Sequence, residues 1–259
     1  MSPLEITVPV MEWMLEAPLI VLLAGATLGV LLEAVVPREY RYSAQTGLAM
    51  LTVLTAMGFT AYNWVGGDFK VVAPGSIAVD GPTYFFWLLL LLVGLGGVAL
   101  FAERAVAGGV SAFAASAATV PGSPLEREAE RQHREHTEIF PLILFALFGM
   151  LLFAAANDLL TLFVALEIFS LPLYLLSGMA RRRRWLSQEA ALKYFLLGAF
   201  SSAFFLFGVA LLYGYAGTFT YAGVAQAIVA DDSPWVLLLT GLVMLAVGLL
   251  FKVGAVPFH

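Results

Sequence analysis

Cysteine is absent from the sequence, and that absence alone removes several kinds of site. A chain without cysteine forms no disulfide, offers no thiolate to a metal ion and cannot hold an iron–sulfur cluster through cysteine ligands. The sequence also shows no nucleotide-binding loop and no catalytic triad. The glycine cluster GLGG at 94–97 lies inside an apolar run, so it indicates close helix packing rather than phosphate binding.

Charged residues are scarce as well. They make up 12% of the 259 residues, whereas 61% are hydrophobic. A soluble domain needs a polar surface, and so few charges cannot cover one, so the composition indicates an integral membrane protein. The first 17 residues contain Glu5, Glu12 and Glu16 but no Lys or Arg. A cleaved signal peptide begins with a basic stretch, so we expect none here.

Long apolar runs dominate what remains. A membrane-spanning helix needs about 20 largely apolar residues, and seven runs approach that length. They are 18–36, 44–65, 83–103, 139–156, 159–180, 188–213 and 235–258. Because lipid offers no hydrogen-bond partner to an open backbone, each run is expected to be a helix. The predicted fold class is therefore all-α, a polytopic transmembrane bundle of about seven helices, with a short interfacial helix within 219–232.

The positive charges predict how the bundle is oriented. Ten of the 13 basic residues are arginines, and all ten fall in the connections after the first, third and fifth predicted helices. The opposite face carries only Lys70. Since positively charged loops stay in the cytoplasm, we expect these connections to be cytoplasmic and the N-terminus to lie outside.

The chain is expected to divide into two parts at residue 139. We expect 1–139 to form the first three helices and a long cytoplasmic connection, whose charged second half can form a short surface helix. Residues 140–259 hold the other four helices. The chain stops two residues after the helix-breaking Pro257 without a polar tail, which is typical of a piece of a longer protein.

Glu167 is a carboxylate inside one of the apolar runs. It lies nine residues after Asp158 and fourteen before Arg181, or about 13 Å and about 20 Å along a helix. A carboxylate near mid-membrane costs a few kcal/mol, so two interpretations are open. Glu167 either stays protonated and holds helices together by a hydrogen bond, or it relays protons or ions beside an intramembrane cation. Two lysines inside spans favour the relay.

Those two lysines differ in their surroundings. Lys193 follows Glu189 by one helical turn, so a local ion pair and a functional role are both open. Lys252 has no acid within 18 residues on its N-terminal side, and a buried Lys loses its proton readily, which favours a functional role. Counted from Pro234, Lys252 lies about 27 Å along its helix, deeper than Glu167. A pair with Glu167 therefore needs a helix that begins outside the membrane or an intervening water.

The remaining ionisable residues carry weaker signals. His259 follows the proline break, where a relay beside Lys252 and an ordinary interfacial position are both open. Glu33 and Glu103 lie at the cytoplasmic ends of predicted helices and are expected to be interfacial. Asp158 is expected to cap the helix that holds Glu167.

The stretch from Phe140 to His259 resembles a known family. ANDLLTLFVALEIFSLPLYLLSGMARRRRWLSQEAALKYFLLGAFSSAFFLFGVALLYG followed by GLLFKVGAVPFH is similar to the antiporter-like membrane subunits of respiratory complex I. The SLPLY after Glu167 and the position of Lys193 most resemble the subunit N family of bacterial NADH–quinone oxidoreductases, rather than subunits L and M or cation/proton antiporter subunits. The first 139 residues match in helix count more than in motif.

The resemblance implies a fold and a set of site residues. The family has 14 helices with two inverted five-helix repeats, each containing a broken helix, and this chain would supply the first repeat. Glu167 would pair with Lys252, Lys193 would serve the proton input side, and His259 would follow the broken segment. The implied function is proton translocation driven by NADH oxidation and quinone reduction. A subunit of a sodium/proton antiporter and a purely structural scaffold remain alternatives.

The resemblance also implies partners and location. We expect no cofactor in this chain, because NADH, FMN, iron–sulfur clusters and quinone would sit on other subunits of the complex. The expected partners are other membrane subunits of complex I and the lipid bilayer, not nucleic acid. The expected location is the bacterial cell membrane.

Overall fold

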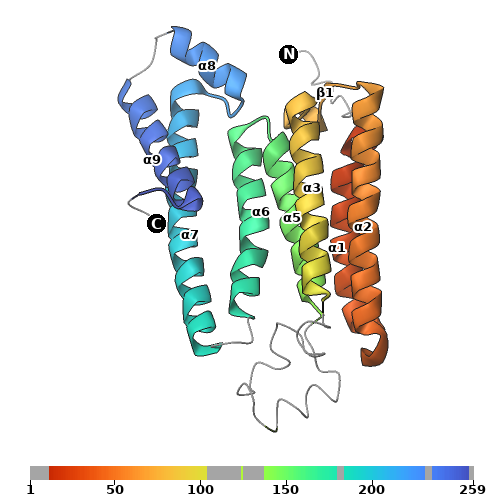
Figure 1. Ribbon diagram of the computed structural model, residues 1–259. Coiled ribbons are helices and arrows are strands. Elements are labelled where there is room, and N and C mark those ends of the chain that lie inside the picture. The colour runs from red at the N-terminus through yellow and green to blue at the C-terminus, as the bar shows by residue number, and fades with distance from the viewer. Residues whose placement is uncertain (1–11, 104–123, 125–136, 180–183, 231–234, 257–259) are drawn as a thin grey trace, which may run out of the picture.

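The computed structural model describes residues 12–103, 124, 137–179, 184–230 and 235–256. Long helices run side by side, and a small hairpin closes one end (Figure 1). The elements are α1 (Trp13–Val35), α2 (Arg38–Gly66), β1 (Lys70–Val72), the 3-10 turn η1 (Ala73–Gly75), β2 (Ile77–Val79), α3 (Gly81–Phe101), α5 (Ile139–Ala155), α6 (Leu159–Gly178), α7 (Arg184–Ala216), α8 (Tyr221–Ala230) and α9 (Trp235–Val253).

All seven predicted membrane helices are present, and α8 confirms the predicted short helix. Six of the described helices are long and apolar enough to cross a membrane. The seventh, α5, has 17 residues, which is the lower limit for a span. α7 begins four residues before the predicted run and has 33 residues, about 50 Å of helix. Because a hydrocarbon core is about 30 Å thick, α7 extends beyond it. The chain is a multi-pass membrane protein.

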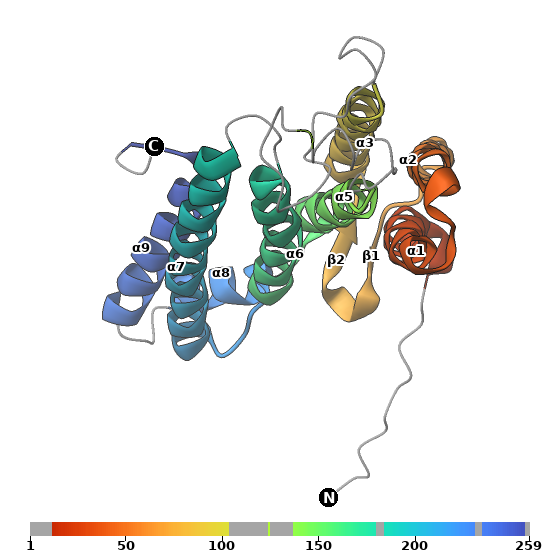
Figure 2. The ribbon, with the colours of Figure 1, turned by 90° about the horizontal axis from the view of Figure 1, so that it is seen from below.

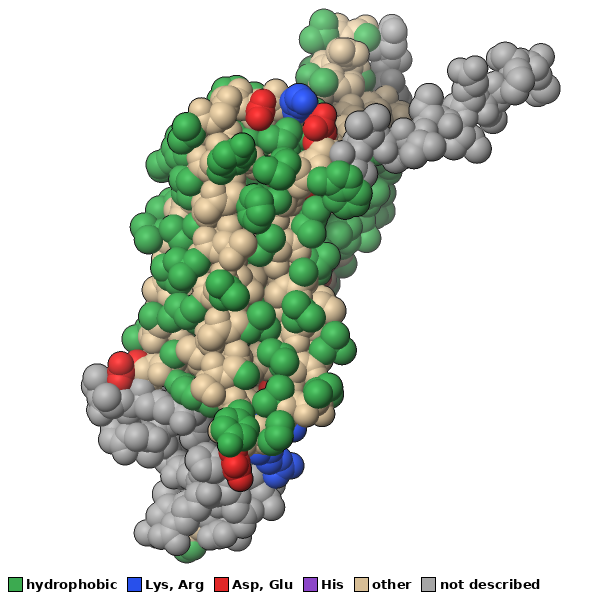
Figure 3. Space-filling model, turned by 90° about the vertical axis from the view of Figure 1, so that its right-hand side faces the viewer, with side chains coloured by type: hydrophobic (Ala, Val, Ile, Leu, Met, Phe, Trp, Pro, Cys, Tyr) green, Lys and Arg blue, Asp and Glu red, His purple; other side chains and the backbone are tan. Residues whose placement is uncertain are grey.

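The helices are arranged in a row of groups. Figure 2, the view from below, shows α9 and α7 on one side, α6 and α5 in the middle, and α1, α2 and α3 on the other side. α1, α3 and α6 all end at the lower end of the bundle in Figure 1, where α2, α5 and α7 begin. The helix ends that flank the three arginine-bearing connections therefore all lie at the same end of the bundle. Figure 3 shows charged side chains at both ends and a largely hydrophobic surface between them.

The hairpin between α2 and α3 was missed by the sequence analysis. Its strands have three residues each and pair antiparallel, with Lys70 opposite Val79. The Asn157 side chain donates to the Gly75 carbonyl oxygen at 2.8 Å, and the Asn157 backbone N–H donates to that of Ser76 at 2.8 Å. The hairpin therefore ties the α2–α3 connection to the short turn between α5 and α6. Strands this short leave no alternating pattern that a sequence reading could detect.

Two apolar clusters hold the helices. The larger joins α1, α2, α3, α5 and the hairpin around the buried Trp87, whose indole N–H donates to the Leu151 carbonyl oxygen at 2.8 Å. The smaller lies between α6, α7, α8 and α9 around Phe205. In α9, Gly248 faces Phe205 so closely that a Cβ would lie 2.6 Å from the Phe205 Cβ. This close approach brings the end of α9 against α7, next to α6.

Candidate functional site

α6 presents three polar side chains on one face. Glu167, Ser170 and Tyr174 are spaced three and four residues apart, so they line up along the helix. The helix start is set by Asp158, whose Oδ1 accepts from the Thr161 backbone N–H at 2.7 Å and whose Oδ2 accepts from the Thr161 hydroxyl at 2.8 Å. The predicted N-cap is confirmed, and Glu167 lies about 13 Å into the helix.

Glu167 receives a hydrogen bond from α7. The buried Ser202 hydroxyl donates to Glu167 Oε1. The Glu167 side chain keeps 28% of its surface exposed, whereas Ser202 keeps 6%. Ser202 therefore holds one carboxylate oxygen at the α6–α7 contact.

Lys252 reaches this carboxylate from α9. Its Nζ lies 4.0 Å from Glu167 Oε1, and its side chain is 12% exposed. The same Nζ donates to the Ser170 Oγ at 2.9 Å and to the Tyr174 hydroxyl oxygen at 3.0 Å. The structure therefore brings the acid and the amine that the sequence singled out within ion-pair distance of each other.

The difference in depth between the two residues is resolved by the course of α9. Figure 1 shows α9 slanting against α7 and beginning farther out than α6. A tilted helix advances less along the bundle axis per residue. A helix that also starts farther out brings its later residues nearer to the level of Glu167. The long Lys252 side chain spans the rest of the separation.

α9 ends directly after Lys252 in a glycine cap. Gly254 adopts φ +70, its N–H donates to the Phe251 carbonyl oxygen, and the Ala255 N–H donates to that of Leu250, both at 3.0 Å. These two bonds form a Schellman motif. Lys252 thus lies in the last helical turn, where the helix dipole favours a cation. The helix break predicted at Pro257 lies outside the described residues, and α9 already ends at Val253, where Gly254 is a helix stop signal in the sequence.

Lys193 lies elsewhere on α7. Its Nζ is 2.5 Å from Glu189 Oε1, and the two side chains are 68% and 57% exposed. This is the local i, i+4 pair that the sequence left open, and the structure does not place Lys193 beside Glu167. Its role on the proton input side stays a prediction. His259 lies outside the described residues, so its role stays a prediction too.

Three hydroxyl groups of the site were missed by sequence reasoning. Ser170 and Tyr174 had a signal, because their spacing from Glu167 places them on the same helix face. Ser202 had none, because it comes from another helix whose rotation the sequence does not specify. With them, the site is one acid, one amine and three hydroxyls within contact distance, a set able to hold and exchange protons.

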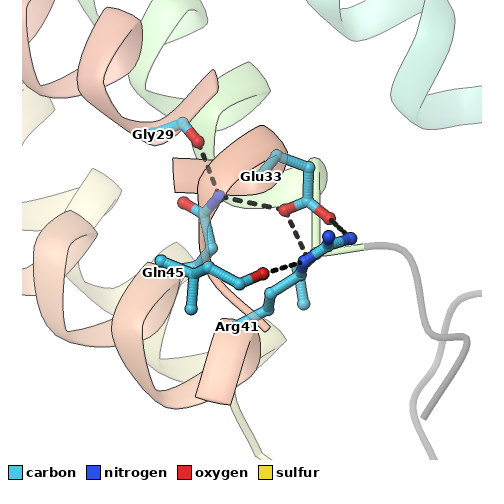
Figure 4. A network of polar contacts seen from close by, with 6 residues as sticks. Gly29, Glu33, Arg41 and Gln45 are labelled. Atoms are coloured by element: carbon cyan, nitrogen blue, oxygen red, sulfur yellow. Dashed lines mark hydrogen bonds and ion pairs between the residues drawn. The ribbon is translucent and has the colours of Figure 1, made fainter. Parts of the chain in front are cut away.

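A second polar network lies at the lower end of the bundle (Figure 4). Glu33 Oε1 forms an ion pair with Arg41 at 3.1 Å. Glu33 Oε2 accepts from the Gln45 amide at 3.1 Å and from the Thr137 hydroxyl at 2.6 Å. Gln45 also donates to the Gly29 carbonyl oxygen at 2.7 Å. The network joins the end of α1 to α2 and to the residues before α5, so Glu33 has a bonding role beyond that of an interfacial residue.

Metal binding finds no support in the part of the chain that the structure describes. There, no group of three or more His, Asp or Glu side chains could hold a metal ion.

The chain is similar to known membrane proteins over nearly its whole length. A family model described as NADH:quinone oxidoreductase/Mrp antiporter, TM, matches residues 156–259. NADH-quinone oxidoreductase subunit N of Cutibacterium acnes is 56% identical over 255 residues, which are 98% of this chain and 47% of that relative. The chain therefore spans about half the length of the relatives it matches.

Solved structures show the same fold. A chain in respiratory complex I from Thermus thermophilus with bound aureothin is 32% identical, with a TM-score of 0.67 over 93% of this chain and 45% of that chain. A chain of the Mrp complex from Dietzia sp. is 21% identical, with a TM-score of 0.68 over 96% of this chain and 42% of that chain. The second likeness shows the fold alone. The predicted all-α, antiporter-like transmembrane fold is confirmed.

Proposed function

Since this chain belongs to the antiporter-like membrane subunit family that includes NADH-quinone oxidoreductase subunit N, we propose that it acts as a proton-translocating membrane subunit of an NADH:quinone oxidoreductase. The observation that carries the proposal is the Glu167–Lys252 pair, 4.0 Å apart inside the helix bundle. The 56% identity to a subunit N supports the oxidoreductase over a sodium/proton antiporter.

The pair has the energetics that a proton relay needs. Two opposite charges 4 Å apart attract by about 4 kcal/mol at an effective dielectric constant of 20. An unpaired charge in the membrane costs a few kcal/mol, so the cost and the attraction are of similar size. Protonation of Glu167 removes the attraction and makes it easier for Lys252 to release its own proton, and the reverse also holds. Each group therefore controls the proton affinity of the other.

The rest of the function belongs to the assembly. In this proposal NADH, FMN, iron–sulfur clusters and quinone are bound by other subunits, and this chain, which has no cysteine to ligate a cluster, moves protons. Its partners are other membrane subunits of complex I and lipid. It lies in the bacterial cell membrane with its arginine-bearing connections in the cytoplasm and its N-terminus outside.

The deciding test is Glu167→Gln in the assembled oxidoreductase, with NADH-driven proton uptake measured in inverted membrane vesicles. The variant keeps the size of the side chain and removes its charge and its exchangeable proton. We expect proton uptake to fall at least tenfold while the complex still assembles. Glu39→Gln is the matched control, because that carboxylate is exposed in the first turn of α2, on the other side of the bundle from the pair.

The outcomes separate the alternatives. Normal uptake in assembled Glu167→Gln would refute the relay and favour a structural scaffold. Sodium-dependent proton exchange without any dependence on NADH would favour the antiporter. Loss of uptake in Glu167→Gln, with uptake retained in Glu39→Gln, would support the proposal.

A further inference from the structure

The Lys252 ammonium lies closer to two neutral hydroxyl oxygens than to the carboxylate. Its Nζ is 2.9 Å from Ser170 Oγ and 3.0 Å from the Tyr174 oxygen, but 4.0 Å from Glu167 Oε1. The last distance is an ion pair beyond hydrogen-bond length. We propose that Ser170 and Tyr174 are positioning residues that form a hydroxyl seat for the Lys252 ammonium and keep it from closing onto Glu167. This inference rests on the proposed function.

The hydrogen bonding of the seat suits a cation. The Ser170 hydroxyl donates to the Leu166 carbonyl oxygen at 2.6 Å, so it meets the ammonium with a lone pair. Glu167 Oε1 is already occupied by the Ser202 hydroxyl. The ammonium thus has two oxygen acceptors in place of the carboxylate, and the carboxylate has a donor of its own.

Tyr174 is held in place by its surroundings. Its side chain is buried, and its ring packs edge-on against Tyr194 of α7, with centroids 4.5 Å apart. Gly198 of α7 makes room for the hydroxyl, because a Cβ there would lie 2.1 Å from that oxygen. Lys252 Nζ lies 5.5 Å from the Tyr174 ring centroid, within cation–π range. These contacts hold the Tyr174 hydroxyl beside the Lys252 ammonium.

Binding of the ammonium by neutral hydroxyls, rather than by the carboxylate, affects how readily Lys252 releases its proton. A Lys252 ammonium in direct contact with Glu167 would hold its proton more tightly, because both charges would be stabilised. At the hydroxyl seat the attraction is weaker, so Glu167 contributes less to holding the proton on the ammonium. Among the residues that the structure describes, the titratable groups that face it are Glu167 and Tyr174 from α6, with Tyr194 of α7 behind Tyr174.

The test is the pH profile of NADH-driven proton uptake in membranes that carry the complex with Tyr174→Phe. The ring and its packing stay, and only the hydroxyl is lost. We expect the ammonium to move onto Glu167, so that the alkaline limb of the profile shifts upward by about one pH unit, a tenfold change in proton affinity. Ser170→Ala should shift the limb in the same direction. Tyr213→Phe, the same change on α7 at a ring that stacks on Phe219, should leave the profile in place.

The sign of the shift decides the question. A hydroxyl that merely supports the ammonium would, when removed, leave the limb unmoved or shift it to lower pH, and either result would overturn the seat. If Tyr174→Phe fails to assemble, Ser170→Ala alone carries the same test. Normal pumping in Glu167→Gln would refute the proposed function, whereas a Glu167-dependent pump without the upward shift would refute only the seat.

Discussion

At the scale of single residues, Glu167 interacts with a hydrogen-bond donor and with an ion-pair partner. The Ser202 hydroxyl is neutral and fixed on α7, whereas the Lys252 ammonium is charged and reaches over from α9. A hydrogen bond to a charged group contributes about 1.5–3 kcal/mol. We therefore expect Ser202→Ala to lower the rate of NADH-driven proton uptake about tenfold, because the carboxylate loses the donor that stabilises its charged form. Vesicle uptake assays would measure this.

The neighbouring serine provides the control. The Ser201 hydroxyl donates to the Gly248 carbonyl oxygen of α9 at 3.0 Å and does not contact Glu167. Ser201→Ala should lower the free energy of unfolding by about 1 kcal/mol and leave the rate of uptake near that of the parent protein. Equal effects of both variants on uptake would show that the α7–α9 contact, rather than the bond to Glu167, sets the rate.

At the scale of helices, α5 and α6 touch directly behind the site. A Cβ on Gly149 of α5 would lie 2.5 Å from the backbone nitrogen of Phe169 in α6, two residues after Glu167. Backbone atoms cannot yield as a flexible side chain can, so the two helices would have to separate. We expect Gly149→Ala to lower the free energy of unfolding in detergent by about 1–3 kcal/mol, the usual range for overpacking.

A second glycine tests whether space or helix propensity decides this result. Within the described part of the chain, a Cβ on Gly96 of α3 would meet no neighbouring atom within 4 Å. Gly96→Ala should stabilise the helix by up to about 1 kcal/mol, because alanine favours helix over glycine. Thermal unfolding of both variants should give shifts of opposite sign. Stabilisation by Gly149→Ala would contradict the close α5–α6 contact.

At the scale of the whole molecule, the bundle is asymmetric in charge from end to end. The helix ends beside the arginine-bearing connections share one end, and Lys70 lies in the hairpin at the other. We expect a fluorescent protein fused after Arg184 to fold and fluoresce, since it would remain in the cytoplasm. A phosphatase inserted before Lys70 should be active, since it would be exported. The opposite pattern of the two reporters would reverse the orientation.

Much of the fold and part of the site could be predicted from the sequence. Helix positions followed from the apolar runs, since a backbone in lipid must satisfy its own hydrogen bonds. Glu167 and Lys252 were found because a charge in such a run is costly. The β1–β2 hairpin was not, because its short strands bury only a few side chains against the α5–α6 turn. The division at residue 139 and the roles of Lys193 and His259 stay predictions.

The sequence by itself determined the number and approximate position of the helices, the shared end of the arginine-bearing connections and the identity of the acid and the amine. Those features depend on local composition and on the cost of burying charge. Only the tertiary structure decided that Lys252 lies within ion-pair distance of Glu167, that Ser202 bonds the carboxylate and that Ser170 and Tyr174 bind the ammonium. These contacts depend on the tilt and rotation of α6, α7 and α9. Close contacts between helices at glycine residues set that tilt and rotation, and the sequence of one helix alone does not specify them.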